Sequence, residues 1–104
     1  MSEFGFEYQG DVITEQDIEL KEPRSYHVVL YNDNYTTMEF VVYALEIIFR
    51  HPSETAHKIM LDVHQKGKGI AGTFTRDIAE TKAFQTRTLA QDHNYPLKCV
   101  AEPA

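Results

Sequence analysis

A β-branched and aromatic run that stops at a cluster of turn-forming residues is the feature that most constrains this chain. Residues 26–31 read Tyr-His-Val-Val-Leu-Tyr, and Asn32, Asp33 and Asn34 follow directly. Such a run favours a strand, and Asn and Asp are typical of the turn that ends one. An amphipathic helix is predicted next, because apolar residues recur at spacings of three and four. Its stripe consists of Met38, Val41, Val42, Leu45, Ile48 and Phe49.

The remaining sequence predicts two more helices and two more strands. Thr36 and Glu39 have the spacing of a capping box for the first helix, and Pro52 ends that helix. The later elements are expected to be a helix from Ser53 to Gly67, a strand over 70–74, a helix from Thr75 to about His93 and a strand over 97–101. The inward residues of the last helix are expected to be Ile78, Ala79, Ala83, Thr86, Leu89 and Ala90.

The order β-α-α-β-α-β favours an α+β domain, in which three helices cover one face of a three-stranded antiparallel sheet. A chain of 104 residues has room for one such domain. Residues 1–22 show no periodicity, and we interpret them as a mobile acidic N-terminal extension ahead of a core domain over residues 23–104.

The distribution of charge argues against a nucleic-acid partner. The formal net charge is −6, and residues 1–24 carry −5 of it, with seven acidic and two basic side chains. The rest of the chain is nearly neutral, whereas a nucleic-acid-binding protein presents a basic face to the phosphates.

The sequence offers little for membrane insertion, catalysis or metal binding. No apolar run has the length of a bilayer span, and no secretory signal pattern opens the chain. The single cysteine, Cys99, cannot form an internal disulfide, which indicates a cytoplasmic protein. His57 and His64 lie seven residues apart, too far for an i, i+4 metal pair, and no nucleophile motif is present. We therefore expect neither an enzyme nor a bound metal or cofactor.

Two segments could bind a ligand, although each also has a plain structural interpretation. The polar run from Asn32 to Thr36 joins a strand to a helix N-terminus, where backbone amides and side-chain oxygens are free. The same residues could serve only to bend the chain. His64 lies at the edge of the apolar stripe of the second helix, either as a packed boundary residue or as a hydrogen-bonding group beside an apolar pocket.

Four blocks of the sequence together resemble the ClpS family, the adaptors of the bacterial Clp protease in the N-end rule pathway. The blocks are residues 26–40, residues 60–64, residues 67–69 together with 75–82, and residues 94–97. The most specific is the asparagine and aspartate turn that Tyr-Thr-x-Met-Glu-Phe follows. The resemblance extends over residues 24–104 and agrees with the α+β order.

The resemblance implies an adaptor that binds proteins by a free N-terminal Phe, Tyr, Trp or Leu and delivers them to a AAA+ Clp unfoldase. It implies a monomer. The residues that match the family's α-amino site are Asn32, Asn34 and His64, with Asp33 beside the peptide backbone. The residues that match its hydrophobic pocket are Thr36, Met38, Val41, Met60, Val63 and Leu97. Asp77 and Lys82 match the surface that docks on the N-domain of the unfoldase.

Two positions depart from the family pattern. Asn34 stands where an aspartate is usual, and Thr37 stands where a proline is usual. Losing that carboxylate removes a charge partner for the substrate amine, and a hydrogen bond to a charged group contributes about 1.5–3 kcal/mol. Either Asp33 compensates in part, or the change marks a second-type paralogue with an altered first-residue preference.

Two other classes of function compete with this interpretation. A protein of the same fold could serve only as a docking module that ignores peptide N-termini. A small hydrolase that uses His64 is disfavoured, because no nucleophile or metal partner accompanies the histidine.

Overall fold

The computed structural model describes residues 24–104, so the predicted N-terminal extension over residues 1–22 lies outside the described residues. The elements are β1 (Ser25–Tyr31), α2 (Met38–Ile47), α3 (Ser53–Lys66), β2 (Lys68–Thr75), α4 (Arg76–Asp92) and β3 (Lys98–Pro103). The predicted order β-α-α-β-α-β is confirmed, and the predicted boundaries differ from the observed ones by a few residues at most.

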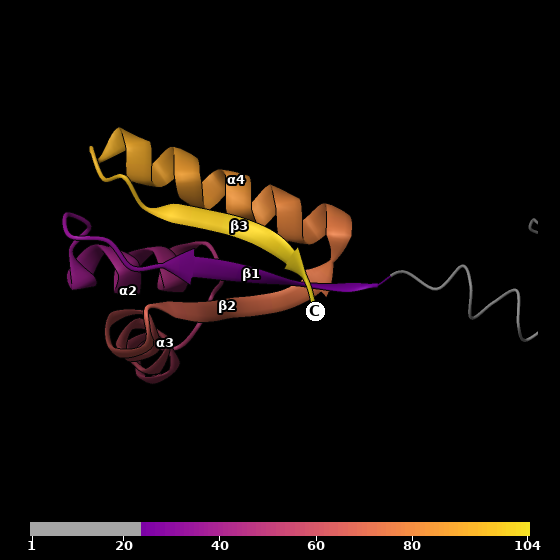
Figure 1. Ribbon diagram of the computed structural model, residues 1–104, viewed down its shortest axis with the longest axis horizontal. Helices are drawn as coiled ribbons and strands as arrows, with labels where there is room; N and C mark the ends of the chain where they lie inside the picture. Colours follow the sequence, from indigo (N-terminus) through magenta and orange to yellow (C-terminus); the bar gives the residue numbers. More distant parts are fainter. Residues whose placement is uncertain (1–23) are drawn as a thin grey trace, which may run out of the picture.

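The three strands form one antiparallel sheet in the order β2-β1-β3, with β1 in the centre (Figure 1). Val28 is paired with Gly72 on one side and Ala101 on the other. The register between β1 and β2 shifts after Val28, so that Val29 is opposite Ile70 and Ala71 is left over as a bulge. The most continuous apolar run of the sequence thus occupies the central strand, where both edges are paired.

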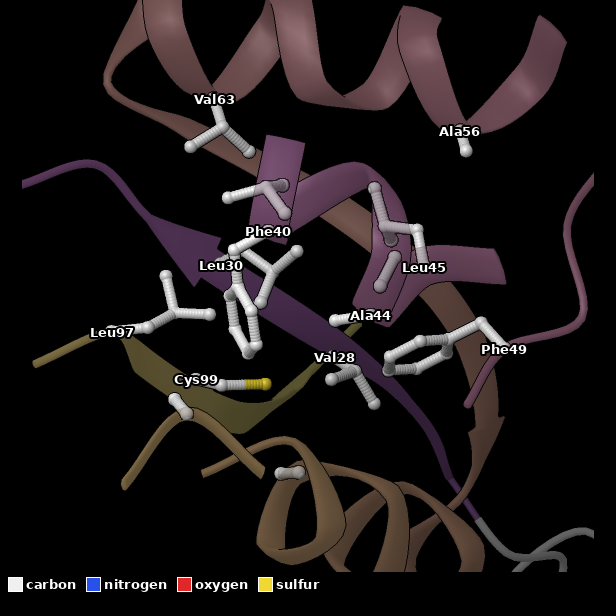
Figure 2. Packing of buried hydrophobic residues seen from close by; sticks show 14 of the residues in the cluster. Val28, Leu30, Phe40, Ala44, Leu45, Phe49, Ala56, Val63, Leu97 and Cys99 are labelled. Carbon is white, nitrogen blue, oxygen red and sulfur yellow. The ribbon is translucent and has the colours of Figure 1, made fainter. Parts of the chain in front are cut away.

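All three helices share one buried core with the sheet, which confirms that they cover a single face. Val28 and Leu30 of β1 are fully buried and point into this core together with Cys99 of β3. Figure 2 shows them packed against side chains of α2 and α3, among which are Leu45 and Val63. Alternate residues of β1 point to the opposite face of the sheet, where His27 Nδ1 lies 2.9 Å from Thr73 Oγ1.

Helix α4 lies close to the sheet through small residues. Ala79, Ala83 and Ala90 are at most 1% exposed, and Thr86 is fully buried with its hydroxyl bonded to the carbonyl of Lys82. The prediction that Ile78 points inward is wrong, because 48% of its surface is exposed. Ile78 and Ala79 are adjacent on the helix, and only the smaller residue occupies the face next to the strands.

The N-terminus of α2 is capped by Thr37 and not by Thr36. Thr37 has extended backbone angles, and its hydroxyl accepts a hydrogen bond from the amide of Phe40 at 3.1 Å. The predicted capping box from Thr36 to Glu39 is therefore wrong. The hydroxyl of Thr36 is directed back to the preceding turn instead, where it helps to build the loop described below.

Two glycines set the turn from α3 to β2. Gly67 ends the helix with a φ of 90°, a conformation that favours glycine. Gly69 packs directly against α3, since a Cβ atom there would lie 2.8 Å from the side chain of Val63. The end of α3 is thereby held against the sheet, next to the point where β1 ends.

Candidate functional site

The loop after β1 is organised by the carboxylate of Asp33. Asp33 Oδ1 accepts hydrogen bonds from the backbone amides of Tyr35 at 2.8 Å and Thr36 at 2.7 Å, and Oδ2 accepts one from the Thr36 hydroxyl at 2.8 Å. Partial burial raises the pKa of the Asp33 carboxyl, but the hydrogen bonds from Thr36 and Tyr35 outweigh it and hold that pKa below its ordinary value. Asp33 is therefore ionised, and its carboxylate stabilises the conformation of the loop through these hydrogen bonds.

A backbone hydrogen bond ties this loop to the end of α3. The amide of Asn32 donates to the carbonyl of Gly67 at 2.9 Å. His64 lies less than one turn before Gly67 on the same helix, with an exposed side chain. The end of β1, the start of α2 and the last turn of α3 consequently meet at one end of the domain, where Figure 1 shows the loop beyond the tip of β1.

A hollow of about 620 Å³ opens where these three segments meet, and residues 32–39 and His64 line it. Of the side chains that match the α-amino site, Asn32, Asn34 and His64 all reach this hollow, and both asparagines are exposed. Asp33 also lines it, although its oxygens are occupied by the loop. His64 and Asn34 are 30 residues apart in the sequence, but in the folded domain both line the same hollow.

The six side chains that match the hydrophobic pocket differ in their burial and in the hollow that they line. Thr36 and Met38 line the hollow itself, and Met38 is 47% exposed at its mouth. Met38 also borders a neighbouring hollow of about 320 Å³ between α2 and α3, which Met60 lines. The remaining three, Val41, Val63 and Leu97, are at most 5% exposed and belong to the core cluster. Figure 2 shows Val63 and Leu97 on either side of Leu30.

Three further residues line the hollow that the resemblance matched neither to the α-amino site nor to the hydrophobic pocket: Tyr35, Thr37 and Glu39. Thr37 is also fixed from outside the loop, because its hydroxyl donates to the phenol oxygen of Tyr95 at 3.4 Å. The ring of Tyr95 packs at 4.9 Å from that of Phe40. The only signal for these residues in the sequence is that they follow the turn directly.

The two side chains that match the unfoldase-docking surface both lie on α4, but they differ in their surroundings. Asp77 is exposed in the first turn. Lys82 is partly buried, and its ammonium donates to the carbonyl of Ile48 at 2.9 Å. It also lies 5.8 Å from the ring centres of Phe49 and Phe74. The ammonium of Lys82 therefore holds the end of α2 to α4.

Two features of the described residues bear on covalent and metal chemistry, the buried thiol of Cys99 and the placement of potential metal ligands. Burial raises the pKa of the Cys99 thiol to about 11, in spite of opposing effects from Thr86 and Arg87, so the thiol stays protonated at neutral pH. Residues 24–104 contain no group of three or more His, Cys, Asp or Glu side chains placed to hold a metal ion. None of the helices formed by these residues combines the length and apolar character that crossing a bilayer requires.

The sequence of this chain matches a known protein family. The family model described as ATP-dependent Clp protease adaptor protein ClpS matches residues 21–100. The chain belongs to the ClpS family. Its members include the ATP-dependent Clp protease adapter protein ClpS of Hyphomonas neptunium, which is 51% identical over 92 residues, a match that spans 88% of this chain and 78% of that protein. The ClpS of Syntrophus aciditrophicus is 50% identical over 99 residues, which span 88% of this chain and 92% of that protein.

A solved structure of this family shares the fold. It is Agrobacterium tumefaciens ClpS2 bound to L-phenylalaninamide, which superposes with a TM-score of 0.77 at 37% sequence identity. The match covers 80% of this chain and 100% of that chain. The chain described here is thus an adaptor protein of the ClpS family, and its α+β architecture is that of ClpS.

Proposed function

We propose that this protein is an adaptor that binds the free N-terminal residue of N-degron substrates and delivers them to a AAA+ Clp unfoldase in the cytoplasm. The first residues that it accepts are Phe, Tyr, Trp and Leu. Asn32, Asn34 and His64 bind the α-amino group, with Asp33 holding their loop in place. The side chain of the first residue enters beside Met38 and rests against Thr36, Val41, Met60, Val63 and Leu97.

The single observation that carries this proposal is that Asn32, Asn34 and His64 line one hollow with Met38 at its mouth. A free N-terminus combines an ammonium donor with a side chain only a few ångströms away, so reading it requires acceptors next to an apolar opening. Amide oxygens and a neutral imidazole nitrogen are acceptors. Burial of a large apolar side chain contributes about 1.5–3 kcal/mol.

The ligand of the ClpS2 structure supports the same assignment by its chemistry. L-phenylalaninamide has a free α-amino group and a benzyl side chain, with a neutral amide where a peptide would continue. The two methionines of our site, Met38 and Met60, are flexible and polarisable, which suits a pocket that accepts side chains of several shapes.

The test is a fluorescence anisotropy series with peptides labelled at the C-terminus. Peptides that start with Phe, Tyr, Trp or Leu should bind, and an Ala-peptide should bind much more weakly. We also expect Ile- and Val-peptides to be rejected, because branching at Cβ adds bulk directly beside the backbone of the first residue. N-acetyl-Phe peptide is the decisive control, since acetylation removes the charge and leaves the acceptors unpaired.

Equal binding of the acetylated peptide would contradict this function and favour a docking module of the same fold. For delivery, we propose that Asp77 and Lys82 on α4 contact the N-domain of the unfoldase. Asp77 is exposed and therefore available for such a contact. The Asp77→Asn variant should retain peptide binding and lose affinity for the isolated N-domain.

A further inference from the structure

The hollow has to accommodate a positive charge, and its lining contains two acidic side chains, Asp33 and Glu39. An ammonium group that leaves bulk water is stabilised by a nearby carboxylate, because amide oxygens and an imidazole nitrogen supply hydrogen bonds without a compensating charge. The surroundings of the two acids decide which carboxylate is free to contact the ammonium group.

Asp33 is poorly available for this purpose. A carboxylate has about four lone-pair positions, and three of those on Asp33 accept hydrogen bonds from Tyr35 and Thr36. Turning the carboxylate toward a ligand would break the bonds that hold the loop. Asn34, the neighbour of Asp33, lines the hollow as well but is neutral.

Glu39 has the opposite character. It lies in the first turn of α2, directly after Met38, with an exposed side chain. Its carboxylate forms neither a hydrogen bond nor an ion pair with any other residue between 24 and 104, so it can reorient without breaking a contact there.

We infer that Glu39 supplies the negative charge that attracts and binds the α-ammonium of the substrate. The inference rests on the proposed function and assigns separate roles to these residues. Asn32, Asn34 and His64 accept hydrogen bonds from the ammonium group, and Glu39 supplies the opposite charge. Because Glu39 is next to Met38 in sequence, the carboxylate and the opening for the first side chain are positioned by the same helical turn.

The experiment compares Glu39→Gln with Glu54→Gln. Glu54 is a matched control because it is an exposed acid in the first turn of a helix, α3, and lines neither hollow. With a labelled Phe-peptide, E39Q should weaken binding about tenfold at low salt, whereas E54Q should stay within about twofold. The effect of E39Q should shrink as salt is raised. Thermal melts should show the same small shift for both variants, because each loses one negative charge in the first turn of a helix.

A second probe separates the charge from the shape of the hollow. The 3-phenylpropionyl peptide has the same side chain and backbone but lacks the α-amine, and E39Q should leave its weak binding unchanged. The additional change Asn34→Asp should restore most of the affinity of E39Q for the Phe-peptide, because it returns a carboxylate to the hollow.

Two results would overturn the inference. One is Phe-peptide binding by E39Q at parent strength, and the other is an equal loss of affinity for both probes, which would assign Glu39 a purely structural role. Both results leave the proposed function intact. If the parent protein itself fails to distinguish the Phe-peptide from the 3-phenylpropionyl peptide, the proposed function fails instead.

Discussion

The hydroxyl of Thr36 donates a hydrogen bond to the carboxylate of Asp33 at 2.8 Å, and this contact closes the loop on which the candidate site depends. Because the backbone amide of Thr36 binds the same carboxylate, the residue is held at two points. The loop is thereby folded before any ligand arrives, and the flanking asparagines are left free to face the hollow.

We predict that Asp33→Ala weakens both the loop and peptide binding. The variant loses three hydrogen bonds to a charged group, and the free energy of unfolding should fall by about 1–2 kcal/mol in urea titrations. Asp62→Ala is the control and should cost about 0.5 kcal/mol or less, because among residues 24–104 the carboxylate of Asp62 forms only a surface ion pair with Lys66, at 3.4 Å.

The contribution of Asp33 should also depend on pH with a defined sign. The pKa of its carboxyl is lower in the folded protein than in the unfolded chain, so the ionised form stabilises the fold. The stability difference between parent and D33A should be fully present above about pH 4, the ordinary carboxyl range, and should disappear as the pH falls through the folded pKa. A difference that persisted in strong acid would contradict this role.

We predict that His64→Ala weakens binding of a Phe-peptide without unfolding the domain. The side chain is exposed, so its removal leaves no cavity, whereas losing a hydrogen bond to an ammonium group costs about 1.5–3 kcal/mol, or roughly 10- to 150-fold in affinity. Gln65→Ala is a matched control on the same helical turn, because Gln65 is exposed and lies outside the hollow. Equal affinities of the two variants would remove His64 from the site.

The architecture was predictable because its signals are local. The apolar run of β1, the three- and four-residue spacing in α2 and the glycine after α3 each indicate an element without reference to the rest of the chain. The burial of Ile78 is an exception to this predictability. Ile78 and Ala79 are adjacent apolar residues at the edge of the helical stripe, and which of them is buried depends on the side chains that pack against the helix.

The details of the site depend on contacts that the linear pattern does not encode. Thr36 and Thr37 are equally good caps by residue type, and the backbone angles of the loop decide which one caps α2. The carboxylate of Asp33 could face a ligand or its own loop, and only the fold shows that it faces the loop. Lys82 binds the carbonyl of Ile48, 34 residues away, which no short-range pattern indicates.

We predict that deletion of residues 1–22 preserves peptide binding and impairs delivery. The hollow begins after the last residue of β1, and the first residue of that strand, Ser25, lies about 20 Å from this end. Anisotropy should give an unchanged affinity for the Phe-peptide, whereas degradation of a Phe-tagged protein by the unfoldase and its protease should slow. A variant with the same 22 residues in scrambled order tests whether length or sequence matters. Delivery at the full rate by the truncated protein would assign the segment no part in this step.

We predict that Lys82→Met lowers the free energy of unfolding by about 1–2 kcal/mol, because it removes a hydrogen bond to the end of α2 and a cation beside two aromatic rings. Lys82→Arg keeps the charge and the donors and should recover most of the loss. Lys58→Met on the exposed surface of α3 is the control and should change stability by less than about 0.5 kcal/mol. If K82M and K58M unfold at the same urea concentration, the ammonium of Lys82 does not hold the two helices together.

A binding measurement on the same variants separates this structural role of Lys82 from its proposed role in docking. The affinity for the isolated N-domain of the unfoldase is measured at a temperature where all variants are folded.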